Sequence, residues 1–281
     1  MEKIGVQMFG LQKECGESVR DTLMKIKEMG YTSVEICVVF KDEIDEIRLG
    51  CEEFEKKYNI GLPKSVFTKK EAEEYISYAR EIGLEVESCH LFGVDMAMGV
   101  IDKLADECIT LSKNTGVNNF VVSYMVDEKE KCKPLIESTN YLVKKLSGNN
   151  ITLCYHNHDM EFNNVGDDET VLDYLFNNCD ERLKFQCDIG WVDRAGKNAL
   201  EYMRKYKDKV ITFHIKDFAK EKINDCPFTA VGTGVVPIKE VIENRNEFNL
   251  IENGIIIEQD ASGGNLMEDI KLGLENVKSI L

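Results

Sequence analysis

The sequence contains no long apolar run and no excess of positive charge. Its hydrophobic stretches all fall short of the about 20 residues that a helix needs to cross a bilayer. The 51 acidic and 35 basic side chains give a net charge of −16 at pH 7. Nucleic acids and anionic membranes attract basic surfaces, so this charge argues against both as partners. The start, Met1-Glu2-Lys3, leads directly into an apolar run without a signal-peptide pattern, which predicts a cytoplasmic protein.

Paired cysteines and nucleotide-binding glycine loops are also missing. The ten cysteines are scattered and include no Cys-x-x-Cys pair, and several, such as Cys37, Cys89, Cys154 and Cys187, lie within apolar runs. A reduced cysteine in such a run behaves as a small hydrophobic residue, so we expect these thiols to be structural. Neither Gly-x-Gly-x-x-Gly nor Gly-x-x-x-x-Gly-Lys-Ser/Thr follows the first apolar run, which removes the usual signature of nucleotide-binding open sheets.

Short apolar runs alternate with longer amphipathic segments along the chain. Eight runs have the length and composition of strands: 4–9, 33–39, 84–90, 119–124, 151–157, 183–188, 210–215 and 255–258. Helical spacing of apolar residues predicts helices after most of them: 19–29, 71–82, 101–111, 133–146, 171–176, 199–206 and 238–248. Gly30 and Gly83 are suitable C-caps for the first two helices.

This alternation of strand and helix predicts a parallel sheet. Eight units that together make up 281 residues, about 35 residues each, favour a closed (β/α)8 TIM barrel over an open doubly wound sheet. No linker or low-complexity tract interrupts the chain, so we expect a single domain over 1–281. The charged and irregular segment 41–66 predicts an insertion after the second strand, for which we favour a solvated helix and loop over part of a lid.

In such a barrel the functional side chains come from the carboxyl ends of the strands. The polar residues at these ends, which should meet at one mouth, are Gln7, Glu35, His90, His156, His158, Asp188, His214, Lys216 and Glu258. All four histidines of the chain belong to this set. One buried histidine usually serves a core hydrogen bond, but four at strand ends favour a functional site.

The stretch YHNHDMEF, which follows Cys154, is the densest of these groups. Because side chains alternate along a strand, His156 and His158 face the same side. Glu161 lies in the loop that follows, from which its carboxylate can turn back over the mouth.

Two later strands end in carboxylates. Glu258 directly follows a purely aliphatic strand, where a buried carboxylate needs a cation or a hydrogen-bonding partner. Asp188 precedes a turn that Gly190 permits. As an alternative, Asp188 and Glu258 are loop caps or ion-pair partners of lysines. Carboxylates combined with an imidazole form an oxygen-rich site that suits one Mn²⁺ or Mg²⁺ ion, and Zn²⁺ or Co²⁺ is also compatible.

The motifs YHNHDMEF, CDIGW, FHIKDF, VGTGVVPIKEVI and IIIEQD resemble the sugar isomerase/epimerase-like superfamily of xylose isomerase-type TIM barrels. The resemblance covers nearly the whole chain, from GVQMFGL to IEQD, and it is specific for the superfamily rather than for one activity. Members include ketose 3-epimerases, inosose dehydratases and metal-dependent subunits of C-glycoside deglycosidases. Endonuclease IV is the poorest relative, because its extra metal-ligating histidines have no obvious counterparts here and the net charge opposes DNA.

The resemblance implies a mononuclear metal site held by Glu, Asp, His and Glu. Matched by motif, the ligands are Glu161, Asp188, His214 and Glu258, and the catalytic residues are His158, Glu161 and Glu258. His158 would be the base. The sequence departs from many relatives at His156, which stands where they have a glutamate at the end of the fifth strand. His156 as the first ligand, in place of Glu161, is therefore an open alternative.

Such a site supports removal of a proton next to a carbonyl group of a sugar or sugar-like polyol. The expected substrate contacts are Gln7, Glu35, His90, His156, Trp191 and Lys216; for Lys216, an ion pair with Asp188 or Glu258 is the alternative. We place a sugar isomerase or epimerase first, and a lyase or dehydratase of keto-sugars or keto-inositols second. A non-catalytic sugar-binding barrel is the third hypothesis, and assembly into a homo-oligomer stays open.

Overall fold

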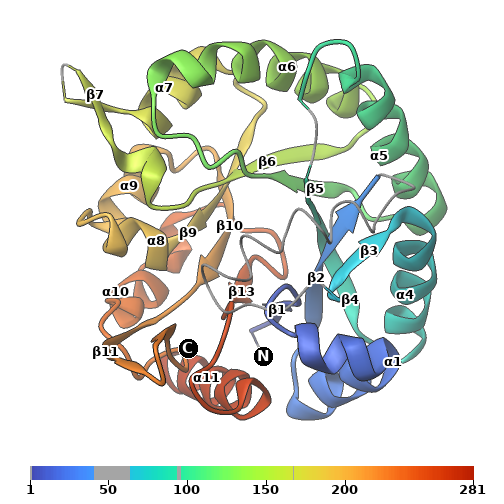
Figure 1. The fold of residues 1–281 in the computed structure, drawn as a ribbon, viewed down its shortest axis with the longest axis vertical. Coiled ribbons are helices and arrows are strands. Elements are labelled where there is room, and N and C mark those ends of the chain that lie inside the picture. Colours follow the sequence, from blue (N-terminus) through green and yellow to red (C-terminus); the bar gives the residue numbers. More distant parts are fainter. Residues whose placement is uncertain (1, 41–63, 94–95, 167) are drawn as a thin grey trace.

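The computed structural model describes residues 2–40, 64–93, 96–166 and 168–281. Most of the predicted insertion, 41–63, therefore lies outside the described residues. Eight parallel strands form a barrel: β1 (Ile4–Gln7), β2 (Ser33–Val39), β4 (Glu85–Leu91), β5 (Asn119–Val122), β6 (Thr152–His156), β9 (Lys184–Asp188), β10 (Val210–Ile215) and β13 (Ile255–Ile257). The first strand pairs with both β2 and β13, which closes the sheet (Figure 1). The predicted TIM barrel is confirmed, and its strands are the eight that the sequence predicts.

Helices surround the barrel (Figure 1). They are α1 (Gln12–Met29), α4 (Lys69–Glu81), α5 (Ile101–Thr115), α6 (Lys129–Ser147), α7 (Val171–Asn178), α8 (Ile189–Arg194), α9 (Ala199–Lys205), α10 (Ile238–Glu243) and α11 (Leu266–Ile280), with 3₁₀ turns η1 (Met160–Phe162) and η2 (Arg245–Glu247). Gly30 ends α1 in the left-handed conformation, at φ 95°, as predicted. Two helices were not predicted: α8 is too short for a periodic pattern, and α11 follows the last strand.

Short strands outside the barrel were also missed. A ninth parallel strand, β3 (Val66–Thr68), extends the sheet beside β2. Two antiparallel hairpins are formed by β7 (Asn164–Gly166) with β8 (Glu169–Thr170) and by β11 (Phe218–Ile223) with β12 (Cys226–Phe228). These strands are at most six residues long and partly exposed, so their composition resembles that of loops.

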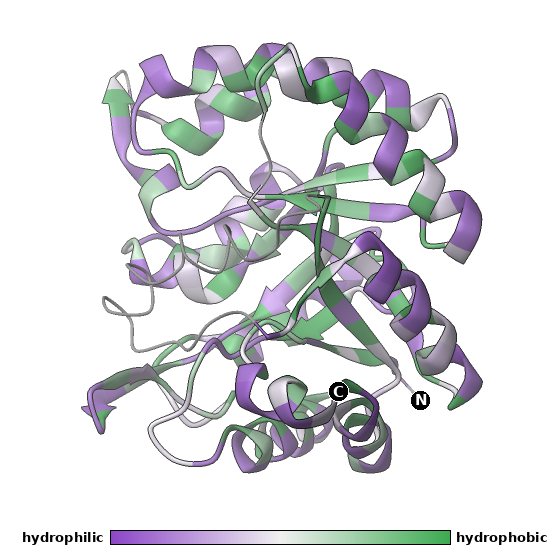
Figure 2. Cartoon of the chain, turned by 45° about the vertical axis from the view of Figure 1, so that its right-hand side comes forward, coloured by the Kyte–Doolittle hydropathy of each residue, from purple (hydrophilic) through white to green (hydrophobic). Residues whose placement is uncertain are grey.

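The core explains why the strand segments are continuous apolar runs. Strands of a TIM barrel are covered by helices on one side and by packed side chains on the other, so both faces are buried. All three isoleucines of β13 are buried, for example. Figure 2 shows the same division, with hydrophobic strands inside and hydrophilic stretches repeated along the surrounding helices.

The cysteines in the described residues are free and mostly buried, as expected for structural thiols. Burial raises the pKa of the Cys37 thiol well above its usual range, so it stays protonated and unreactive. In the described parts of the chain, no helix combines the length and the apolar character that crossing a membrane requires.

Candidate metal centre

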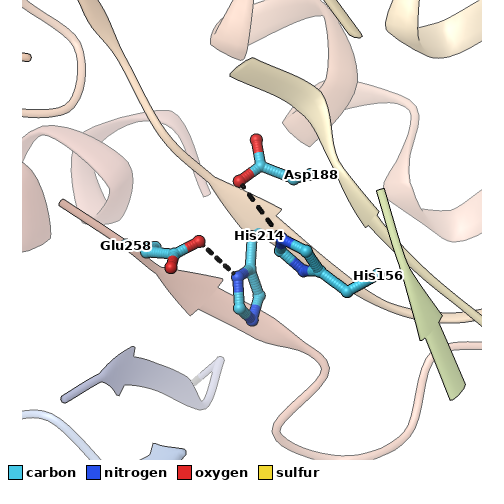
Figure 3. Close-up of side chains that lie close together, drawn as sticks. All are labelled: His156, Asp188, His214 and Glu258. Carbon is cyan, nitrogen blue, oxygen red and sulfur yellow. Dashed lines mark hydrogen bonds and ion pairs between the residues drawn. The ribbon is translucent and has the colours of Figure 1, made fainter. Parts of the chain in front are cut away.

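Four neighbouring strands bring two histidines and two carboxylates together. They are His156 at the end of β6, Asp188 at the end of β9, His214 in β10 and Glu258 directly after β13. The strand register places His214 beside Asp188. One nitrogen or oxygen atom from each of the four side chains lies within 4.8 Å of the others, and all four residues are buried (Figure 3).

The contacts within this group leave atoms that suit a cation. One oxygen of Asp188, Oδ1, accepts a hydrogen bond of 3.0 Å from the backbone N–H of Trp191 and caps α8. The other oxygen, Oδ2, is buried and makes no hydrogen bond within the described residues, although the Lys216 ammonium lies 3.4 Å from it. Oδ2 lies 3.9 Å from Nε2 of His156. A buried carboxylate oxygen without a hydrogen bond is costly, and a bound divalent ion would satisfy it.

His214 lies between two carboxylates. Its Nδ1 is 2.7 Å from Oε2 of Glu258, and its Nε2 is 3.2 Å from Oε1 of Glu35. Burial on its own would lower the pKa of His214, but these two carboxylates raise it to about 10. The imidazole is therefore protonated in the metal-free protein, and a metal would replace one of its protons.

The ammonium group of Lys216 lies among three carboxylates. Its Nζ is 3.4 Å from Asp188, 3.2 Å from Glu258 and 2.9 Å from Asp260. The ion pairs that were the alternative for Lys216 are thus present, and its contact with a substrate stays a prediction. Asp260 was not predicted, although it is two residues beyond Glu258 and follows the same strand.

These charges act differently on the two carboxylates of the group. Burial favours the neutral form of Glu258, but Lys216 and His214 outweigh burial and hold its pKa well below the usual range. Burial raises the pKa of Asp188 to about 7, because Lys216 compensates only part of the lost solvation. An additional cation would stabilise the ionised form of Asp188.

Glu161, three residues after His158, is not part of the group of four. Its Oε1 accepts a hydrogen bond of 2.8 Å from the Tyr155 hydroxyl, and its Oε2 accepts one of 2.9 Å from the backbone N–H of His158. These two bonds hold the carboxylate within η1, and burial raises its pKa to about 7. The geometry thus favours His156, the alternative first ligand, over Glu161.

His158 stands at the edge of the group. Its ring centroid is 5.1 Å from that of His156 and 5.7 Å from that of Trp191. Burial, followed by the charge of Lys216, lowers the pKa of His158 to about 3, so its imidazole is neutral at physiological pH. Its buried Nδ1 has no hydrogen-bond partner among the described residues. A neutral imidazole with an unused nitrogen beside a cation site can accept a proton from a substrate.

Glu35 and Gln7, which were predicted to contact the substrate, form hydrogen bonds with other side chains inside the barrel. The buried Glu35 carboxylate accepts hydrogen bonds from Gln7 (2.6 Å), from Gln186 (2.7 Å) and from the Ser88 hydroxyl. Nδ1 of His90 lies 3.4 Å from the same carboxylate. Substrate contact by these residues stays a prediction, and the geometry favours a supporting role for Gln7 and Glu35. Gln186 was missed, although it lies two residues before Asp188 and therefore on the same strand face.

Trp191 provides an aromatic surface beside the carboxylates. The ammonium of Lys216 lies 4.8 Å from its ring centroid, and the ring packs edge-on against Phe218 at 5.2 Å. Its buried indole Nε1 has no hydrogen-bond partner in the part of the chain that is described. Gly190 allows close packing rather than a turn, since a Cβ there would lie 2.7 Å from the carbonyl oxygen of Lys216.

A closed parallel barrel with buried histidines and carboxylates at its strand ends defines a TIM barrel with a candidate divalent-metal centre. The chain belongs to the xylose isomerase-like TIM barrel family, whose model matches residues 23–280. The superfamily predicted from the motifs is thereby confirmed.

The individual relatives share low sequence identity with this chain. An inosose dehydratase from Clostridium perfringens is 29% identical over 165 residues, which cover 52% of this chain and 53% of the relative. The match thus spans about half the length of that protein. A sugar phosphate isomerase/epimerase from Parabacteroides distasonis superposes with a TM-score of 0.74 at 19% identity, over 98% of this chain and 92% of its own. A xylose isomerase-like TIM barrel protein from Mycobacterium smegmatis, in complex with magnesium, gives a TM-score of 0.67 at 14% identity, over 100% and 96%. At these identities the structures support the fold alone.

Proposed function

We propose that the protein is a divalent-metal-dependent enzyme that removes a proton next to a carbonyl group of a sugar or polyol. The observation that carries this proposal is the buried group of His156, Asp188, His214 and Glu258, with the neutral imidazole of His158 beside it. The first candidate activity is isomerisation or epimerisation.

The residues that would hold the ion are His156, Asp188, His214 and Glu258. When bound there, a divalent ion would polarise a substrate carbonyl and stabilise the negative charge that develops next to it. Two imidazoles and two carboxylates make a softer donor set than the predicted three carboxylates and one imidazole. This set suits Mn²⁺, Co²⁺ or Zn²⁺ better than Mg²⁺.

The side chains around the ligands transfer the proton and bind the substrate. His158 accepts the proton, because it is neutral and its Nδ1 has no hydrogen bond to lose within the described structure. Lys216 keeps a positive charge beside the carboxylates and orients a substrate oxygen. The Trp191 ring covers the apolar face of the substrate, and its indole N–H donates to a hydroxyl group.

Elimination is the second candidate, and it shares the proton-abstraction step. Epimerases of this superfamily are expected to use two opposed metal-bound glutamates, whereas a histidine occupies the first of these positions here. The partial similarity to an inosose dehydratase favours the same alternative. In an elimination, loss of a leaving group follows proton removal and produces an unsaturated carbonyl compound.

Incubation with keto-sugars and keto-inositols in D₂O, in the presence of Mn²⁺ or Co²⁺, tests the proposal. Deuterium should enter the carbon next to the carbonyl, as measured by NMR, and His158→Ala should slow the exchange. An epimer or isomer as product supports the first activity, and an enone with ultraviolet absorbance supports the second. A protein that binds both metal and sugar without any exchange would be the non-catalytic barrel of the third hypothesis.

A further inference from the structure

A chain of hydrogen bonds crosses the barrel from β1 to β6 through the buried Glu35 carboxylate. Its direction is set at the β1 end, where the backbone N–H of Phe9 donates to Oε1 of Gln7 at 2.9 Å. A backbone N–H can only donate, so the Gln7 amide oxygen must point toward it. The amide nitrogen of Gln7 then faces Glu35 and donates to Oε1 at 2.6 Å.

The other carboxylate oxygen of Glu35 continues the chain toward β9. Its Oε2 accepts a hydrogen bond of 2.7 Å from Nε2 of Gln186, and the Ser88 hydroxyl donates to the same oxygen. Because an ionised carboxylate only accepts, the Gln186 amide must present its nitrogen to Glu35 and its oxygen to the opposite side. Both glutamines and the carboxylate are at most 2% exposed, so solvent does not compete for these bonds.

The amide oxygen of Gln186 lies 3.0 Å from Nδ1 of His156. An oxygen acceptor requires a hydrogen on that nitrogen, and a neutral imidazole carries only one. We propose that Glu35, acting through Gln186, holds His156 as the Nδ1–H tautomer and so directs the Nε2 lone pair at the metal centre. This inference rests on the proposed metal site, and it makes Glu35 and Gln186 positioning residues rather than substrate contacts.

The surroundings of Nε2 agree with this tautomer. Nε2 of His156 lies 3.9 Å from Oδ2 of Asp188, too far for a hydrogen bond, although that oxygen makes no other hydrogen bond within the described residues and has only the Lys216 ammonium near it, at 3.4 Å. A hydrogen on Nε2 would point at the space where the ion is expected and would block coordination there. The Gln186 amide, which contacts His156 rather than the ion, therefore allows a histidine to act as a ligand at this strand end, where many superfamily members have a glutamate.

The tautomer can be observed in the metal-free protein by ¹⁵N NMR of histidine-labelled samples. The chain has only four histidines, so loss of one set of signals in His156→Gln assigns the ring nitrogens. The wild-type spectrum should show a protonated Nδ1 and an unprotonated Nε2 for His156. In Gln186→Leu the ring should lose this preference, and affinity for Mn²⁺ or Zn²⁺, measured by calorimetry, should fall about 10- to 100-fold.

Two further variants separate the hydrogen-bond chain from general loss of packing. Glu35→Leu removes both carboxylate oxygens, including the acceptor that orients Gln186, and should reproduce the effect of Gln186→Leu on the His156 tautomer. The tautomer is the readout for this variant, because Glu35 also lies 3.2 Å from His214 and its loss would affect metal affinity by that route as well. Ser88→Ala removes another donor to the same carboxylate but leaves the chain intact, so tautomer and affinity should both match wild type.

A wild-type His156 with its hydrogen on Nε2 would overturn the inference, as would Gln186→Leu with unchanged tautomer and affinity. Failure of the proposed function has a different signature. In that case the wild-type ring would have the expected Nδ1–H tautomer, which supports the inference, while calorimetry detected no binding of Mn²⁺, Co²⁺, Zn²⁺ or Mg²⁺.

Discussion

Asp188 serves two purposes with its two carboxylate oxygens, since Oδ1 caps α8 and Oδ2 faces the candidate metal centre. Asp188→Asn keeps an oxygen for the cap but loses the negative charge, so metal affinity should fall by about 100-fold or more while stability stays near wild type. Asp188→Ala should lose the metal and, in addition, about 1 kcal/mol of stability, because the N-cap is removed. Metal analysis and urea denaturation measure the two effects separately. Full metal content in Asp188→Asn would contradict its role as a ligand.

The two histidines after Tyr155 should differ when each is replaced. His158→Ala should lower turnover by roughly 10²- to 10⁴-fold, the usual contribution of a general base, with metal content near wild type. His156→Ala should lose the metal itself, because His156 belongs to the group of four and its Nε2 lies 3.9 Å from Oδ2 of Asp188. Turnover and metal content are measured on the same preparations.

Glu161 provides the matched comparison for His156. Glu161→Gln keeps an oxygen for the Tyr155 hydroxyl and should retain the metal, since Glu161 lies outside the group of four. If Glu161→Gln loses the metal and His156→Ala keeps it, the ligand role first predicted for Glu161 is right and the assignment of His156 is wrong.

Between elements, Asp217 holds the loop after β12 against the end of β10. Its side chain is 1% exposed and accepts four backbone hydrogen bonds. The donors are Phe218, Gly232, Gly234 and Val236. This loop carries the VGTGVVP motif, and Gly234 is required there because a Cβ would lie 2.2 Å from the carbonyl oxygen of Phe218.

Asp217→Ala should therefore destabilise the protein by about 3 kcal/mol, since hydrogen bonds to a charged acceptor are lost and buried N–H groups remain unpaired. Asp217→Asn keeps the Oδ1 position, which accepts from Phe218 and Val236, and should cost less. Urea denaturation of wild type, Asp217→Asn and Asp217→Ala measures the free energy of unfolding, which should decrease in that order. Equal stability of wild type and Asp217→Ala would show that the loop is held by its apolar contacts instead.

At the scale of the whole molecule, the barrel should not depend on the metal for its fold. The apolar core is formed by strands and helices from the whole described chain, whereas the candidate ligands lie at one end of four strands. A chelator should leave the far-ultraviolet circular dichroism unchanged. Free metal at 100 times its Kd should add about 2.7 kcal/mol to the free energy of unfolding.

The matched control is Asp188→Asn, whose thermal unfolding should not respond to added metal. A barrel that unfolds on chelation would show that the ion is structural. A wild-type melting temperature that ignores Mn²⁺, Co²⁺, Zn²⁺ and Mg²⁺ alike would contradict the metal site.

The sequence by itself determined the barrel and three members of the candidate metal centre. Strand periodicity depends on local composition, and parallel strands place their carboxyl ends at one face, so Asp188, His214 and Glu258 were expected at one mouth without knowledge of contacts. Their assignment as ligands came from the resemblance to the superfamily. The short hairpins and α8 were missed because they bury too little surface to impose a pattern on their residues.

Only the tertiary structure shows which neighbouring side chain lies together with these three. His156 and Glu161 are five residues apart and both chemically suitable, but the Tyr155 hydroxyl and the His158 N–H hold Glu161 away from the group. Gln186, in turn, depends on Glu35, which is 151 positions earlier in the chain. Hydrogen bonds between distant strands orient individual atoms, and no local pattern encodes that orientation, because it depends on which side chains the closed barrel brings together.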